Sequence, residues 1–138
     1  MLWATRLGCH VDRTACIWLI RRRIDPDAEF RFFRDVSEAP EGAELFDVAG
    51  ARLSHRGNAC SFETMLEEYD LGDPVLREIS EIVHDADLMD DMYGRPESDG
   101  LDAVIRGMQL VLSDDEALAL HTDVVFDGLY AYLRRETL

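Results

Sequence analysis

The fold class is decided by residues 2–34, which read LWATRLGCHVDRTACIWLIRRRIDPDAEFRFFR. Residues 2–6 have the aromatic and β-branched character of a short strand. Asp12 stands where it can cap a helix that runs to about Arg23, with apolar residues at helical spacing. A following Asp-Pro pair ends this helix, because proline keeps the preceding residue out of helical geometry. Residues 29–34 begin with alternating apolar and charged side chains, so the pattern predicts a βαβ-like start.

The remainder of the chain is mostly helical after one more short strand. Residues 45–48 resemble a strand closed by Gly50. Four helices are then expected, beginning at Ser61, Asp73, Leu101 and Ser113 and ending near Tyr69, His84, Leu112 and Arg135. Ser113 and Glu116 have the spacing of a capping box. We therefore expect one α+β domain over residues 1–138: a small N-terminal sheet of two to three strands, followed by a bundle of about four helices.

The net charge of the chain limits the classes of partner that it can bind. It carries 29 acidic and 14 basic residues, a net charge of −15, and every basic residue is arginine. Such a field repels nucleic acids and anionic membranes, so we expect no direct nucleic-acid or membrane partner. The absence of lysine excludes Schiff-base and P-loop chemistry. Seven of the arginines lie within the first 34 residues, which makes the N-terminal part basic and the remainder strongly acidic.

Three cysteines, Cys9, Cys16 and Cys60, form an odd set without CxxC spacing. Charged residues interrupt the N-terminal apolar stretch before it reaches the length of a signal peptide. The longest uncharged apolar stretch covers residues 15–20, which is too short to cross a bilayer. We therefore expect a cytoplasmic protein with reduced thiols.

The start of the first helix is a candidate anion site. Arg13 and Cys16 are three residues apart, so both lie on one face near the helix N-terminus. Free backbone N–H groups and a guanidinium favour an anion there, and they would lower the pKa of a thiol. The alternative is a buried Cys16 that packs in the core beside an ordinary ion pair of Arg13.

A second candidate is a metal site built from residues of the acidic part. His55 lies in a glycine-containing loop, and Glu63 follows it near the start of a helix. His84 and Asp87 are three residues apart on the next helix, and such spacing can present two ligands to one ion. Mixed nitrogen and oxygen donors suit zinc, manganese or iron. The alternative is that each histidine caps a helix or forms a hydrogen bond in the core.

Seven blocks of the chain form a recognisable pattern: residues 11–22, 24–30, 46–50, 55–57, 60–63, 84–87 and 126–130. This pattern resembles the chromate-resistance family, which includes the C-terminal domain of ChrB-type proteins. The resemblance covers nearly the whole chain and implies a role linked to chromate resistance. It also implies that this chain is the domain alone, without the N-terminal regulatory half of longer members.

These observations leave three hypotheses open, and they leave open whether the chain is an enzyme. In the first, a metal- or thiol-dependent protein binds or transforms an oxyanion such as chromate. Arg13, with Arg21 or Arg56, holds the anion. Cys16 or Cys60 then donates electrons as the catalytic residue. Alternatively, a transition-metal ion (Zn, Mn or Fe) is bound by His55, Glu63, His84 and Asp87. In the second, a non-catalytic oxyanion sensor or interaction module works with a separate DNA-binding regulator. In the third, the matched residues mainly hold the fold. A homo-oligomer is compatible with all three.

Overall fold

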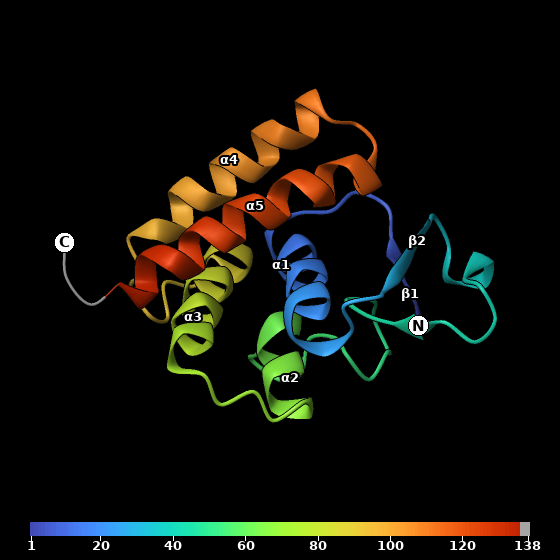
Figure 1. The fold of residues 1–138 in the computed structure, drawn as a ribbon, viewed down its shortest axis with the longest axis horizontal. Coiled ribbons are helices and arrows are strands. Elements are labelled where there is room, and N and C mark those ends of the chain that lie inside the picture. Colours follow the sequence, from blue (N-terminus) through green and yellow to red (C-terminus); the bar gives the residue numbers. More distant parts are fainter. Residues whose placement is uncertain (136–138) are drawn as a thin grey trace.

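A small sheet precedes a set of helices in the computed structural model, which describes residues 1–135 (Figure 1). The predicted α+β class is therefore confirmed. The elements are, in chain order, β1 (Leu2–Arg6), α1 (Val11–Leu19), the π-helical turn η1 (Ile20–Ile24), β2 (Glu29–Phe33), the 3₁₀ turn η2 (Val36–Glu38), β3 (Glu44–Leu45), α2 (Ser61–Glu68), α3 (Pro74–Leu88), α4 (Glu97–Val111) and α5 (Asp115–Arg134).

The sheet has three parallel strands in the order β2-β1-β3. Leu2 pairs with Glu29 and Arg6 with Phe33, so the two predicted strands align over their full length, with α1 and η1 as the crossover between them. This confirms the βαβ-like start. Trp3 of the central strand is buried and meets the ring of Phe46 edge-on, which places the sheet against the aromatic part of the core.

Helix α1 forms the centre of the molecule. It is buried at every position except Arg13, and it contacts α2, α3, α4 and α5. Trp18 stacks on Phe62 of α2 and packs against Phe126 of α5. Figure 1 shows α4 and α5 side by side over one side of this helix, with α2 and α3 beneath. A helix buried nearly all round is typical of a core helix, which explains why residues 15–20 are uncharged.

Several element boundaries differ from the sequence prediction. The cap of α1 is His10, and Asp12, the predicted cap, instead accepts the Ser61 N–H at the start of α2. Cys60, one residue before the predicted Ser61, is the cap of α2, and Asp114, one residue after Ser113, accepts the Ala117 N–H at the start of α5. The predicted capping box of Ser113 and Glu116 is therefore wrong, since the neighbouring carboxylate takes the exposed N–H group.

Two further boundaries have conformational causes. Strand β3 ends at Leu45 rather than 48, because Asp47 adopts a left-handed conformation that turns the chain out of the sheet. Helix α3 continues to Leu88, beyond the predicted end at His84, and Met89 ends it in the same conformation. Helix α4 begins at Glu97, earlier than predicted.

Within residues 1–135, no helix combines the length and the apolarity that crossing a bilayer requires.

Candidate functional site

Four residues from four parts of the chain converge on one pocket, and we call them the His55 cluster: Asp12, Asp47, His55 and Asp87. The Nε2 atom of His55 lies 3.2 Å from a carboxylate oxygen of Asp12 and 3.2 Å from one of Asp87. Asp47 lies slightly farther from the same nitrogen, at 3.8 Å. The pocket has a volume of about 330 Å³ and is also lined by His10 and Arg13.

Two of these carboxylates are held by helix starts and by an arginine. Asp12 accepts the backbone N–H groups of Ser61 and Phe62 at 2.9 and 3.0 Å, so a carboxylate of α1 caps α2. Asp47 accepts a hydrogen bond from the Ser61 hydroxyl at 2.6 Å and from Arg13 Nε at 2.9 Å. The cluster is therefore built on helix ends of the core, and its carboxylates are fixed before any ligand arrives.

The carboxylates of this cluster are crowded. Burial, and then the negative charge of Asp12, raises the pKa of Asp47 to about 6 and that of Asp87 to about 6. The hydrogen bond to Asp12 is the main cause that raises the pKa of His55 to about 9. A protonated imidazole thus lies among three acidic groups, an arrangement that favours a cation in the pocket.

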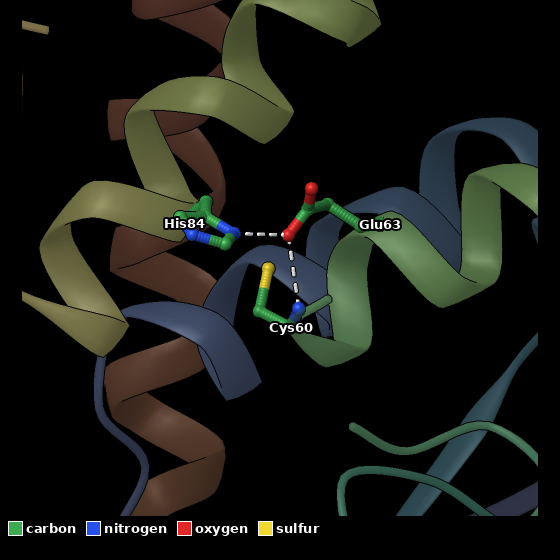
Figure 2. Close-up of side chains that lie close together, drawn as sticks. All are labelled: Cys60, Glu63 and His84. Carbon is green, nitrogen blue, oxygen red and sulfur yellow. Dashed lines mark hydrogen bonds and ion pairs between the residues drawn. The ribbon is translucent and has the colours of Figure 1, made fainter. Parts of the chain in front are cut away.

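A second group, the His84 cluster, consists of Cys60, Glu63 and His84 (Figure 2). His84 is fully buried on α3, and its Nδ1 atom lies 2.5 Å from Glu63 Oε1. The other ring nitrogen, Nε2, lies 2.9 Å from a carboxylate oxygen of Asp90. Burial lowers the pKa of His84, but the hydrogen bonds with Glu63 and Asp90 outweigh it and raise the pKa overall.

The structure thus distributes the four predicted metal ligands between two clusters. His55 and Asp87 lie in the first, and Glu63 and His84 lie in the second. Sequence reasoning did not assign Asp12, Asp47 or Asp90 to any site. Asp12 and Asp47 stand inside the family-like blocks, which is a signal that could have found them, whereas Asp90 stands in an acidic loop that has no pattern.

Each of the three arginines predicted to hold an oxyanion pairs with a carboxylate. Arg13 binds Asp47 and also donates to the carbonyl oxygens of residues 6–8. Arg21 pairs with Asp123 at 2.7 Å, and Arg56 with Glu68 at 2.6 Å. Only Arg13 lines the pocket of the His55 cluster. Anion binding by these side chains stays a prediction, and each guanidinium already has a counter-charge.

The expectation that the helix N-terminus lowers the pKa of Cys16 is wrong. Burial raises the pKa of Cys16 well above its ordinary value, and the negative charge of Asp12 adds to the effect. Burial is also the main cause that raises the pKa of Cys60. Without a metal, both thiols therefore stay protonated at neutral pH, which disfavours a reactive thiolate at either position.

Comparison with known proteins shows which family this chain is similar to. The family model described as ChrB, C-terminal domain, matches residues 3–133. Protein ChrB of Cupriavidus metallidurans is 40% identical to this chain over 133 residues, which are 94% of this chain and 40% of that protein. The chain thus spans about two fifths of the length of this relative. No solved structure matches the chain.

Proposed function

Because the chain belongs to the family of ChrB C-terminal domains, we propose that it acts in chromate resistance as a metal-dependent oxyanion-binding protein. In this proposal, Asp12, His55 and Asp87 hold a divalent transition-metal ion, which binds His55 Nε2 in place of its proton and releases that proton to solvent; an oxyanion such as chromate then binds at that ion in the pocket. The observation that carries the proposal is the convergence of two carboxylates on one imidazole nitrogen, at 3.2 Å each.

The spacing of the donor atoms supports a metal ion. Two ligand atoms that each lie about 2.0–2.2 Å from one ion are separated by about 3 Å. The two distances from His55 Nε2 have this magnitude, and the ligand atoms of all three residues lie within 4.8 Å of one another. Oxygen and nitrogen donors without sulfur suit Mn²⁺, Fe²⁺ or Zn²⁺. Asp47 is not one of the three proposed ligands. It adds negative charge beside them and accepts hydrogen bonds from Ser61 and Arg13.

An oxyanion needs such a cation in this pocket. Three carboxylates surround the space, and a dianion such as chromate would be repelled by them. Arg13 cannot supply the attraction alone, because its guanidinium is engaged by Asp47 and by backbone carbonyl oxygens. A divalent ion both compensates the carboxylates and leaves coordination positions that an oxyanion can take.

Binding is favoured over thiol-based reduction by the state of the cysteines. Cys9, Cys16 and Cys60 are all buried, and burial is the main cause of the raised pKa of each thiol. The proposal therefore takes the form of a non-catalytic oxyanion sensor. A regulatory partner that touches DNA has to supply its own positively charged surface, because this chain carries a net charge of −15.

The test combines metal analysis with calorimetry on protein purified without an affinity tag. The chain is reconstituted with Mn²⁺, Fe²⁺ or Zn²⁺, and its metal content is compared with that of His55→Ala. The exposed His121, whose Nδ1 atom bonds a backbone carbonyl of its own helix, provides the control variant His121→Ala. We expect a lower metal stoichiometry in His55→Ala and an unchanged one in His121→Ala.

Titration with chromate, and with sulfate as a second tetrahedral dianion, follows on the protein loaded with Mn²⁺ or Zn²⁺ and on the metal-free protein, because chromate oxidises Fe²⁺. We expect saturable binding only to the metal-loaded protein, without consumption of chromate in the presence of a reductant. Equal metal content in wild type and His55→Ala, or equal chromate binding with and without metal, would overturn the proposal. Sustained reduction of chromate would replace the sensor with an enzyme.

A further inference from the structure

We propose a second metal site, in which the sulfur of Cys60, the carboxylate of Glu63 and the Nδ1 atom of His84 bind a thiophilic divalent ion, with Zn²⁺ as the first choice. This inference does not rest on the proposed function, because none of its ligands belongs to the His55 cluster. The ligand atoms of the three residues lie within 4.8 Å of one another. In Figure 2 the thiol, the carboxylate and the imidazole face the same space.

The start of α2 pre-arranges two of the ligands. Cys60 is the N-cap of this helix, and Glu63 is its third residue. The Glu63 carboxylate accepts the Cys60 N–H at 2.9 Å, so the two side chains are held on the same side of the first turn. The helix N-terminus also favours negative charge on both groups. Thiolate and imidazole donors together select zinc over magnesium, calcium or manganese.

Asp90 orients the third ligand. Its carboxylate binds His84 Nε2 at 2.9 Å, which leaves Nδ1 directed at Glu63 and Cys60. A carboxylate on the far nitrogen is the usual outer partner of a histidine that binds a metal. The loop that carries Asp90 is fixed as well, because Asp85 accepts the backbone N–H groups of Tyr93 and Arg95.

When no metal is bound, the proposed ligand atoms of this site carry protons. The hydrogen-bonded proton lies between His84 Nδ1 and Glu63 Oε1, and the thiol of Cys60 keeps its own proton. Binding of Zn²⁺ forms bonds to sulfur, oxygen and nitrogen, and it releases the thiol proton and the Nδ1 proton to solvent. The alternative is a purely structural imidazolium that joins α2 to α3. That role uses Glu63, His84 and Asp90, and it leaves the Cys60 side chain only its part in the capping box of α2.

A cavity of about 480 Å³ borders the site at one of its ligands. Glu63 lines it with Tyr93 and with residues of α2 and α3, whereas Cys60 and His84 are fully buried. Three protein ligands leave one position of a tetrahedral zinc ion for water or another small ligand. The site therefore has the ligand number of zinc centres that exchange a ligand.

X-ray absorption of the zinc-loaded wild-type chain is the first test. We expect nitrogen or oxygen neighbours at about 2.0 Å and a sulfur neighbour at about 2.3 Å, which averages to about one half per zinc ion when the His55 cluster is filled as well. A zinc-loaded chain without a sulfur neighbour would overturn the proposal. This measurement needs no variant, so it decides the question even if a substitution prevents folding.

Cobalt substitution then assigns the sulfur to its residue. Co²⁺ bound by a thiolate gives a charge-transfer absorption band in the near ultraviolet. We expect the band in wild type, in Cys9→Ser as a matched buried-cysteine control, and in His55→Ala, but not in Cys60→Ser. Its loss in His55→Ala, or its persistence in Cys60→Ser, would contradict the assignment. Because His55→Ala keeps this band while losing metal from its own cluster, failure of one proposal is distinguishable from failure of the other.

Asp90 is a positioning residue in this scheme. We expect Asp90→Asn to keep the charge-transfer band and to lower zinc affinity by about 10–100-fold, as is typical when the partner of a ligating histidine is changed. A purely structural role for Asp90 would change the stability of the chain and leave the zinc affinity of the folded protein unaltered.

Discussion

His84 and Asp87 lie three residues apart on α3, yet their side chains belong to different clusters. His84 binds Glu63 and Asp90, whereas Asp87 lies 3.2 Å from His55. The start of α2 is common to both. The Cys60 N–H binds Glu63 of one cluster, and the next two N–H groups bind Asp12 of the other. A change at this helix start therefore reaches both candidate sites.

The cap that Asp12 provides for α2 makes a first prediction. Removing the carboxylate in Asp12→Ala leaves two buried N–H groups without partners, so we expect a loss of about 2–3 kcal/mol in the free energy of unfolding. Asp12→Asn keeps an accepting oxygen and should lose less. Urea denaturation of the metal-free chain measures both, with the exposed Asp27→Asn as a control that stays near wild type. An unchanged midpoint for Asp12→Ala would show that the cap is dispensable.

Arg13 gives a prediction that separates a structural role from anion binding. Its guanidinium binds Asp47 and three carbonyl oxygens of residues 6–8. We expect Arg13→Ala to cost about 2–4 kcal/mol without any anion present, because the partly buried Asp47 loses its nearest counter-charge and the three carbonyl oxygens lose a donor. Arg13→Lys should recover only part of this, since a single ammonium cannot reproduce the fork. Unchanged unfolding together with weaker chromate binding would instead support the anion role predicted from sequence.

The sequence predicts the fold well where local patterns determine it. The apolar spacing of residues 2–34 predicts a strand, a helix and a second strand, and the structure has these elements in this order. Asp73 is followed by a proline, and this local signal places the start of α3 correctly. The error at the start of α1 arises because the partner of a side chain is distant. Asp12 is a capping residue, as predicted, but it caps a helix 49 residues farther along the chain.

The candidate sites depend more on tertiary structure, which explains what the sequence missed. The spacing of His84 and Asp87 predicts one shared ion. This spacing does not predict where the start of α2 lies, and backbone N–H groups at that start bind carboxylates of both clusters. Asp47 reaches the pocket because of a left-handed backbone conformation that ends β3 early. No periodic pattern encodes such a turn, so the family-like block around Asp47 is the one signal in the sequence that points to this carboxylate.

Asp73 gives a prediction on acid stability away from both clusters. Burial raises its pKa, but hydrogen bonds from Tyr130, the Val75 N–H and Arg23 lower it below the ordinary value overall. A carboxyl with a lowered folded-state pKa adds stability above the unfolded pKa of about 3.9, and this stability is lost as the pH falls through the lower value. Asp73→Asn should therefore cost about 1–2 kcal/mol at neutral pH and progressively less in acid.

The measurement is urea denaturation of wild type and Asp73→Asn across the pH range from neutral to strongly acidic. Asparagine is itself a good N-cap, so the variant isolates the charge rather than the cap. Glu67→Gln on the exposed face of α2 is the control for removal of a carboxylate, and its free energy of unfolding at neutral pH should stay near that of wild type. A difference for Asp73→Asn that stays constant into acid would mean that the charge contributes nothing.

Asp87 makes the prediction that tests the His55 cluster most directly, because two effects of one substitution have opposite signs. Burial and the charge of Asp12 raise the pKa of Asp87 to about 6. A raised carboxyl pKa is a cost to stability that is fully present above that value and disappears as the pH falls toward the unfolded value. Asp87→Asn should therefore stabilise the metal-free chain by about 1 kcal/mol at pH 8, and this gain should vanish in acid.

The same substitution removes a ligand. An ion that binds only the folded chain stabilises it by about 2.7 kcal/mol at a hundredfold excess over its dissociation constant. Asp87→Asn should lose most of this gain, so the variant melts above wild type in chelator and below it in excess metal. Asp27→Asn should follow wild type in both conditions. A variant that is less stable than wild type in chelator would show that the His55–Asp87 pair outweighs the crowding. One that gains as much from metal as wild type would remove Asp87 from the ligand set.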